Sequence, residues 1–171
     1  MPRRCYTLGV MALEVVKRRC PNVEIVFYGD KKEKYNNVPF EFTNLGMTET
    51  IYELGELYRS STLGICFSTT NPSLVPYEMM ACGCPVVDLD VNGNEVNYDG
   101  FDNSVLVAAT PDSIAEGVIG ILENSAFAAE LRSRGIEFAK RFPTEVEMAK
   151  VIESTILEQF EKTKQGALAA H

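Results

Sequence analysis

The stretch 68–87, STTNPSLVPYEMMACGCPVV, holds the groups best suited to chemistry in this chain. Its Ser, Thr and Asn residues offer hydrogen bonds, and Pro76 suits the first turn of a helix that would begin near residue 75. The start of a helix presents free N–H groups and a partial positive charge, which together favour phosphate without any lysine. The loop before Pro76 is therefore a candidate site for a phosphorylated ligand.

Glu78 lies one turn into that expected helix, between Tyr77 and Met79 in an otherwise apolar stretch. Burial of its carboxylate would cost free energy, so we expect the side chain to face a crevice or the solvent. In a crevice it can accept hydrogen bonds from two hydroxyl groups of a ribose, as acidic residues do in dinucleotide-binding folds. A solvent-facing glutamate on the helix surface is the alternative.

The charged residues around this loop are all acidic. No Lys or Arg occurs between Arg59 and Arg132, whereas ten acidic residues occur there. A diphosphate bound to the loop must therefore rely on backbone dipoles, on Arg3 or Arg4, or on a segment absent from this chain.

Metal and thiol chemistry find little support in the sequence. The five cysteines stand at positions 5, 20, 66, 82 and 84, and the single histidine is His171, so a ligand set with zinc spacing is lacking. We expect no metal site. We expect Cys66, Cys82 and Cys84 to pack as small apolar side chains, because no histidine is available to activate a nucleophile.

Two other classes of α/β protein are weaker alternatives. Asp88 and Asp90 end a predicted strand, as the phospho-acceptor of a receiver domain would, but a receiver also needs a lysine at a later strand end and none occurs near 104–110. A dinucleotide-dependent dehydrogenase would carry G-x-G-x-x-G after a strand, and this sequence has no such motif.

The elements that must position these residues alternate along the chain. The strands are apolar without polar alternation, which is typical of a parallel sheet covered by helices on both faces. The fold class is therefore α/β with a doubly wound parallel sheet, and ligands are expected outside the carboxyl ends of its strands. Helices are predicted over 4–20, 49–60 (capped by Thr48), 75–82, 111–123, 126–141 and 145–163, strands over 23–29, 40–46, 63–68, 85–90 and 104–109, and a polar loop over 91–103.

The order of these elements has one irregularity. The chain opens on a helix, whereas a doubly wound unit normally opens on the strand that becomes central in the order 3-2-1-4-5-6. That first strand is apparently missing, which would leave a gap between the strands at 23–29 and 63–68. Open strand edges attract other chains, so we expect self-association.

Composition limits the class of protein. With 171 residues, 46% hydrophobic and 23% charged, the chain is expected to form one globular domain over 1–163, followed by a frayed tail at 164–171. A net charge of −8 disfavours nucleic acid as a partner. No apolar run approaches the roughly 20 residues of a membrane span, and MPRRCYTLGV lacks the apolar region of a signal peptide, so we expect a cytoplasmic protein.

The sequence resembles the C-terminal, donor-binding domain of group-1 GT-B glycosyltransferases over nearly its whole length. That family carries a Glu, seven residues, a second Glu and then A-x-G-x-P-V-V, and here Glu78 is followed by ACGCPVV at 81–87. Gly93-Asn94-Glu95 looks like the family's G-G-N-x-E loop. The opening PRRCYTLGVMAL is similar to rhamnosyltransferase-like members, in which an arginine-bearing loop leads into this helix. The resemblance implies the Rossmann-like half of a GT-B fold.

The resemblance also implies roles for individual residues. Glu78 would bind the ribose hydroxyls, and Leu45 and Gly46 would lie against the base. Thr70 stands where the family's first Glu would fall, so the contacts of that carboxylate do not carry over. The diphosphate and the sugar would be contacted by the loop that contains Thr70, Asn71, Ser73, Leu74 and Val75.

The implied function is transfer of a hexosyl or deoxyhexosyl group from a nucleoside diphosphate sugar to a glycan or other acceptor, with no cofactor besides the donor substrate. GT-B catalysis takes place between two domains, and the N-terminal acceptor-binding domain is absent here. We therefore expect the isolated chain to be inactive and to work with that domain or with a partner chain, and no catalytic residue is assigned. The alternative is a non-catalytic nucleotide-binding or assembly module derived from such an enzyme.

Overall fold

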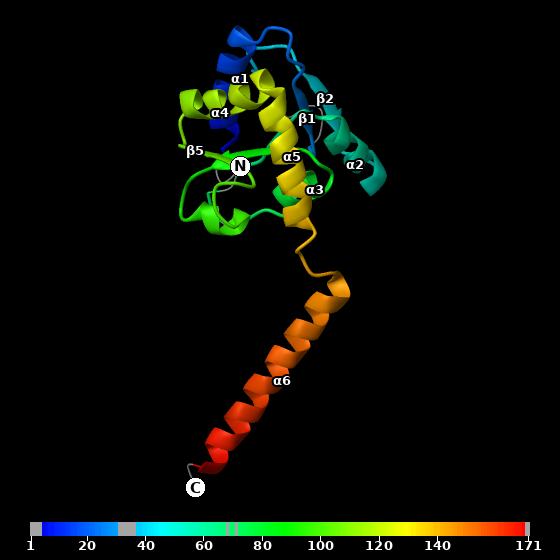
Figure 1. Cartoon of the computed structure of the whole chain (residues 1–171), viewed down its shortest axis with the longest axis vertical. Coiled ribbons are helices and arrows are strands. Elements are labelled where there is room, and N and C mark those ends of the chain that lie inside the picture. The colour runs from blue at the N-terminus through cyan, green and yellow to red at the C-terminus, as the bar shows by residue number, and fades with distance from the viewer. Residues whose placement is uncertain (1–4, 31–36, 68, 71, 170–171) are drawn as a thin grey trace. The chain divides into compact units, whose positions relative to one another are not determined.

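A computed structural model describes residues 5–30, 37–67, 69–70 and 72–169, with side chains described through residue 163 (Figure 1). The chain divides into two compact units, Met1–Ala139 and Lys140–His171. The first unit carries the sheets and all of the candidate site residues that are described. Its elements are α1 (Tyr6–Arg19), β1 (Val26–Tyr28), β2 (Thr43–Gly46), α2 (Ile51–Ser60), β3 (Gly64–Ile65), α3 (Val75–Ala81), β4 (Val86–Leu89), the 3₁₀ helix η3 (Asn94–Tyr98), β5 (Val105–Val107), α4 (Pro111–Glu123) and α5 (Ser125–Ala139).

All of the strand pairs in this unit are parallel. Strand β1 pairs with β2, and β4 lies between β3 and β5. The strand order is β2-β1 in one sheet and β3-β4-β5 in the other. When β1 to β5 are counted as strands 2 to 6 of a doubly wound unit, this is the order 3-2-1-4-5-6 with the first strand left out. The predicted α/β class with a doubly wound parallel sheet is confirmed.

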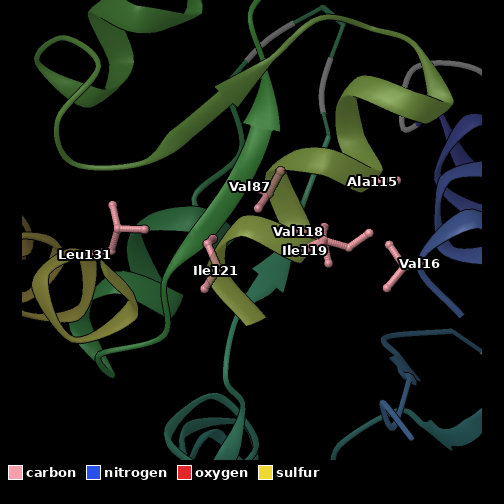
Figure 2. Close-up of a cluster of buried hydrophobic side chains, with 7 residues drawn as sticks. All are labelled: Val16, Val87, Ala115, Val118, Ile119, Ile121 and Leu131. Carbon is pink, nitrogen blue, oxygen red and sulfur yellow. The ribbon is translucent and has the colours of Figure 1, made fainter. Parts of the chain in front are cut away.

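Strand β4 shows why this unit needs helices on both faces of the sheet. All four of its residues are buried, so side chains that point in opposite directions must both find apolar partners. Val86 packs on one side with Tyr58 of α2 and with Met79 and Met80 of α3. Figure 2 shows the cluster on the other side, formed by Val16, Val87, Ala115, Val118, Ile119, Ile121 and Leu131.

The strands beside the gap are shorter than predicted. Strand β3 covers only Gly64–Ile65 of the predicted 63–68, and β1 covers only Val26–Tyr28 of the predicted 23–29. Each has a ladder partner on one side alone among the described residues, so few backbone groups are fixed in a ladder. The apolar pattern predicted the positions of both strands correctly. Their lengths were predicted too long, because the length of a strand depends on the neighbouring strands that pair with it.

Two local predictions were wrong. Thr50, not Thr48, caps α2, because its side-chain oxygen accepts a hydrogen bond of 3.2 Å from the Glu53 backbone N–H. Glu53 in turn accepts from the Glu49 N–H at 2.8 Å, which completes a capping box. The segment 91–103, predicted as a polar loop, contains the 3₁₀ helix η3.

The second unit contains one helix, α6 (Glu145–Ala169), which continues beyond the predicted end at residue 163. Thr144 and Glu147 form a capping box at its start: Thr144 Oγ1 accepts from the Glu147 N–H, and Glu147 accepts from the Thr144 N–H at 2.8 Å. Several large apolar side chains of α6 are exposed, among them Ile152, Ile156 and Phe160. The domain boundary at residue 163 stays a prediction.

Candidate functional site

The ends of β1 and β2 meet at the carboxyl edge of their sheet. Gly29 follows β1, Gly46 ends β2, and the Gly29 N–H donates to the Gly46 carbonyl at 2.8 Å. Both glycines have positive φ angles, 84° for Gly29 and 70° for Gly46, a backbone conformation that residues with a Cβ atom rarely adopt. Asn44 fixes the second turn, since its side-chain oxygen accepts from the Gly46 N–H at 3.0 Å. Of the two residues predicted to lie against a base, Gly46 is buried and Leu45 is 43% exposed.

The loop before α3 presents several of the residues predicted to contact a diphosphate. Thr70 is exposed, Ser73 is half-buried and Leu74 is 73% exposed, while Val75 is the first residue of α3. Ser73 Oγ accepts a weak hydrogen bond of 3.4 Å from the Val75 N–H. Pro76 takes the expected place in the first turn. The predicted contacts Asn71, Arg3 and Arg4 lie outside the described residues.

Glu78 is exposed on α3, so its carboxylate has not been buried. The residues that follow it on α3, Met79 and Met80, pack in one cluster with Tyr58 and Tyr28. Burial raises the pKa of Tyr28 and of Tyr58, and the negative charge of Glu78 raises both further. Tyr28 ends β1, and its hydroxyl lies 3.0 Å from that of Tyr58. Glu78 therefore lies within electrostatic range of the carboxyl end of β1, the edge that also carries Gly46.

A buried carboxylate organises the neighbouring loop. Asp88 is 4% exposed, and its Oδ2 accepts hydrogen bonds from the Tyr98 hydroxyl at 2.7 Å and from Asn94 Nδ2 at 3.0 Å. Its Oδ1 accepts from the Leu89 N–H at 2.7 Å. Asn94 Nδ2 also donates to the Leu89 carbonyl at 2.8 Å. The carboxylate thus holds both ends of η3 against the end of β4.

Further hydrogen bonds tie η3 to the rest of the candidate site. The Tyr77 hydroxyl on α3 donates to the Asn97 carbonyl at 3.0 Å. Asn92 Nδ2 donates to the Thr69 carbonyl at 3.3 Å. Asn103 Nδ2 donates to the Tyr98 carbonyl at 2.7 Å. The loop after β3 and the loop after β4 are therefore joined to one another and to the helix that carries Glu78.

Sequence reasoning missed this network. The signal was present, because an aspartate in the otherwise apolar strand at 85–90 must be paired if it is buried. The reading of Asp88 as a phospho-acceptor does not suit the structure, since both of its oxygens accept hydrogen bonds inside the fold. Asp90, the second acidic residue of the pair, is exposed.

The cysteines and methionines near the site pack in the core. Met79 and Met80 are 2% and 1% exposed, and Cys84 is 1% exposed beside them. Burial raises the pKa of the Cys84 thiol to about 12, so it stays protonated at neutral pH. Cys66 and Cys82 are half-buried. Among the described residues, no group of three or more His, Cys, Asp or Glu side chains could hold a metal ion.

Sequence comparison places this chain beside known proteins. A family model described as "WsaF, C-terminal domain" matches residues 1–119. The O-antigen biosynthesis protein RfbC of Myxococcus xanthus is 34% identical over 158 residues, which are 90% of this chain and 12% of that protein. The chain thus spans about an eighth of this relative.

Solved structures share the fold. Sucrose-phosphate synthase from Thermosynechococcus elongatus has a TM-score of 0.74 and 20% identity over 94% of this chain and 44% of that chain. HepE of Anabaena, solved in complex with UDP-glucose, has a TM-score of 0.75 and 19% identity over 92% of this chain and 46% of that chain. The C-terminal domain of the group-1 glycosyl transferase LpcC from Francisella tularensis has a TM-score of 0.69 and 15% identity over 82% of this chain and 80% of that chain.

No helix in the part of the chain that the structure describes is both long enough and apolar enough to cross a membrane.

Proposed function

Because the chain belongs to the WsaF C-terminal domain family and has the fold of the C-terminal half of a GT-B glycosyltransferase, we propose that it binds the nucleoside diphosphate sugar from which a glycosyl group is transferred. One observation carries most of this proposal. The loop before α3 follows β3 and the turn at Gly46 ends β2, so both lie at the carboxyl ends of parallel strands, where open α/β sheets bind their ligands, and Glu78 lies one turn into α3.

In this proposal each part of the edge has its own task. The carboxylate of Glu78 accepts hydrogen bonds from the two ribose hydroxyls, and the turn at Leu45 and Gly46 contacts the base. The loop from Thr70 to Val75 offers backbone N–H groups to the diphosphate and the sugar, with Arg3 and Arg4 as further candidates for the phosphates. In this proposal the Asp88 network does not contact the sugar donor. Its hydrogen bonds hold η3 against β4, and the bond from Tyr77 to Asn97 holds α3 against η3.

The transfer itself would need a second domain. The bond between the anomeric carbon and the diphosphate oxygen breaks, a bond to an acceptor hydroxyl oxygen forms, and the hydroxyl proton leaves with solvent or a base. Hydrogen-bond donors of the protein, positioned around the diphosphate, would stabilise the negative charge that develops on this leaving group. We propose that the acceptor site lies on another domain or chain, that the transferred group is a hexose or deoxyhexose, and that the acceptor is a glycan.

Calorimetric titration of the purified chain with UDP, GDP and dTDP tests donor binding. One of the three should bind, and Glu78→Gln should weaken that binding by about tenfold or more, because the acceptor loses its charge and one of its two oxygens is replaced by an NH2 group, which cannot accept a hydrogen bond. Glu123→Gln is the matched control, since it changes an exposed carboxylate at the far end of α4 and should leave the affinity unchanged. Absence of binding to all three nucleotides, or equal affinity in Glu78→Gln, would contradict the proposal.

The alternative of a nucleotide-binding module without transferase activity is distinguished by supplying an acceptor half. The chain fused to, or mixed with, the remainder of a relative of the RfbC type should release nucleoside diphosphate from the donor that it binds. Binding without release in every such combination would favour the non-catalytic module.

A further inference from the structure

The hydroxyl groups of Tyr28 and Tyr58 lie 3.0 Å apart, and their rings meet edge to face with centroids 5.8 Å apart. Tyr28 ends β1, and Tyr58 is a buried residue of α2. We propose that this tyrosine pair is a positioning element of the donor site, which holds the turn at Leu45 and Gly46 at the distance from Glu78 that lets one nucleoside contact both. The inference rests on the proposed function and adds two residues to it.

One side of the tyrosine pair is tied to the turn that would contact the base. In the parallel ladder between β1 and β2, the register shifts between Phe27 and Tyr28, and Tyr28 lies opposite Gly46. The shift leaves Leu45 as an extra residue of β2, as in a β-bulge. Bulges re-aim side chains and are frequent beside functional sites. Tyr28 is therefore the residue of β1 against which this turn is built.

The side chain of Tyr28 faces the helices α2 and α3. Successive residues of a strand point to opposite faces of the sheet. Phe27 points to the face covered by α1, where its ring centroid lies 6.4 Å from that of Tyr6. Tyr28 points to the other face and reaches Tyr58 there. The hydrogen bond between the two hydroxyls thus joins the end of β1 to α2.

The other side of the tyrosine pair belongs to the packing around α3, the helix that carries Glu78. Both tyrosines pack in the buried cluster that includes Val75, Met79 and Cys82. Val75 lies three residues before Glu78 and Cys82 four residues after it, so both share its side of the helix. Burial raises the pKa of both phenols and the negative charge of Glu78 raises it further, which agrees with this placement. The tyrosine pair therefore connects the turn to the helix of the carboxylate.

The hydroxyl groups add a fixed distance to the packing of the two rings. Binding groups must be held within about 0.5 Å of their productive geometry by the packing and hydrogen bonds behind them. Phenylalanine at either position keeps the ring and removes this bond, so the spacing between β1 and α2 is set less tightly. Both phenols stay protonated at neutral pH, so the tyrosine pair places no second negative charge near Glu78.

Calorimetric titration of Tyr58→Phe tests the inference with whichever of UDP, GDP and dTDP binds the unchanged chain. The affinity should fall about fivefold, because the energy of one buried hydrogen bond no longer holds the site in its binding geometry. The stoichiometry should stay the same, which shows that the variant is folded. Tyr52→Phe is the matched control, because it removes a hydroxyl from the same helix at a side chain that is 78% exposed, and its affinity should not change.

A nucleotide without ribose hydroxyls separates positioning from a general effect on the fold. The 2′,3′-dideoxy form of the same nucleotide cannot donate hydrogen bonds from its sugar to Glu78. Its affinity, measured by displacement of the natural nucleotide, should therefore change less than about twofold in Tyr58→Phe. Glu78→Gln should reduce the effect of Tyr58→Phe on the natural nucleotide in the same way, because two changes that act on one contact are not additive.

Tyr28→Phe checks the other half of the tyrosine pair. It breaks the same hydrogen bond and should weaken binding of the natural nucleotide by a similar factor. The double variant Tyr28→Phe/Tyr58→Phe should bind no more weakly than the weaker of the two single variants. Losses that multiply in the double variant would show that the two hydroxyls act separately and would overturn the inference.

Two further results would overturn the inference and leave the proposed function intact. One is equal affinity of Tyr58→Phe and the unchanged chain for the natural nucleotide. The other is an equal loss of affinity for the natural and the dideoxy nucleotides, which would mean that the tyrosine pair only stabilises the fold. Failure of the unchanged chain to bind any of the three nucleotides would instead contradict the proposed function itself.

Discussion

The Tyr98 hydroxyl donates a hydrogen bond of 2.7 Å to Oδ2 of Asp88, and both side chains are buried between the end of β4 and η3. Burial and the negative charge of Asp88 raise the pKa of Tyr98, so the phenol remains a donor over the whole neutral range. The pair holds η3 in place within the connection of 15 residues, 90–104, that joins β4 to β5. This loop adjoins the candidate donor site, so its rigidity bears on binding as well as on stability.

Asp88→Ala should lower the free energy of unfolding by about 2–3 kcal/mol, because the Tyr98 hydroxyl and the Asn94 amide lose a charged acceptor inside the fold. Tyr98→Phe should cost less, since the carboxylate keeps its other donors. Urea unfolding measures both. Asp90→Asn is the control, because Asp90 is exposed two residues further along and should change stability by less than about 0.5 kcal/mol. Equal stability of Asp88→Ala and Asp90→Asn would contradict the prediction.

The sequence pattern predicted the elements better than it predicted their ends. The apolar runs at β4 and α4 were located closely, because each is buried and its periodicity is set by the layers around it. Strand β3 was predicted too long, because strand length depends on ladder partners that the local sequence does not encode.

The candidate site was predicted less completely than the fold. Glu78 was singled out from its residue type and surroundings, and its exposure agrees with a carboxylate that avoids the core. The link from Asp88 to Tyr98 spans ten residues, and the link from Tyr77 to Asn97 spans twenty. Such contacts depend on how β4, η3 and α3 pack, so they could not be read from spacing along the chain.

High pH should destabilise the protein through Cys84. Burial raises its pKa in the folded state to about 12, above the ordinary value of 9.0. The stabilising contribution is complete below pH 9 and is lost as pH rises toward 12, because only the unfolded chain releases the proton in that window. At pH 10 the loss from Cys84 is about 1.4 kcal/mol, with smaller additions from the buried tyrosines.

Urea unfolding at pH 8 and at pH 10 measures this loss. Cys84→Ala removes the thiol, so its free energy of unfolding should fall less between the two pH values than that of the unchanged chain. Cys20→Ala is the control, because it removes a half-buried thiol that lies outside the buried cluster around Cys84. An equal pH dependence in Cys84→Ala and the unchanged chain would refute the assignment to Cys84.

Acid should weaken the start of α6. The hydrogen bonds from Thr144 to the Glu147 carboxylate lower the pKa of Glu147 below its ordinary value of 4.5. A lowered pKa means that the ionised group stabilises the cap above that value, and that the stabilisation is lost as pH falls through the folded-state pKa. Helix content, followed by circular dichroism at 222 nm, should therefore fall between about pH 5 and pH 3.

Glu147→Gln is the informative comparison for this cap, because glutamine can complete a capping box without titrating. Its helix content should depend less on pH over the same window. Thr144→Ala removes the hydroxyl that accepts from the Glu147 N–H and should lower helix content at every pH. Superimposable pH curves for Glu147→Gln and the unchanged chain would show that the cap does not titrate as expected.

Two glycines three residues apart on α4 should respond to alanine with opposite signs. A Cβ on Gly120 would meet nothing within 4 Å, so Gly120→Ala gains helix propensity and should raise the free energy of unfolding by about 0.5–1 kcal/mol. A Cβ on Gly117 would lie 2.8 Å from Val107 Cγ1 and 3.2 Å from Val105 Cγ1, and branched side chains in β5 have little freedom to move. Gly117→Ala should therefore lower it by about 1–2 kcal/mol despite the same gain in propensity. Urea unfolding of both variants tests this prediction. If the two substitutions changed the free energy of unfolding in the same direction, α4 would not pack this closely on β5.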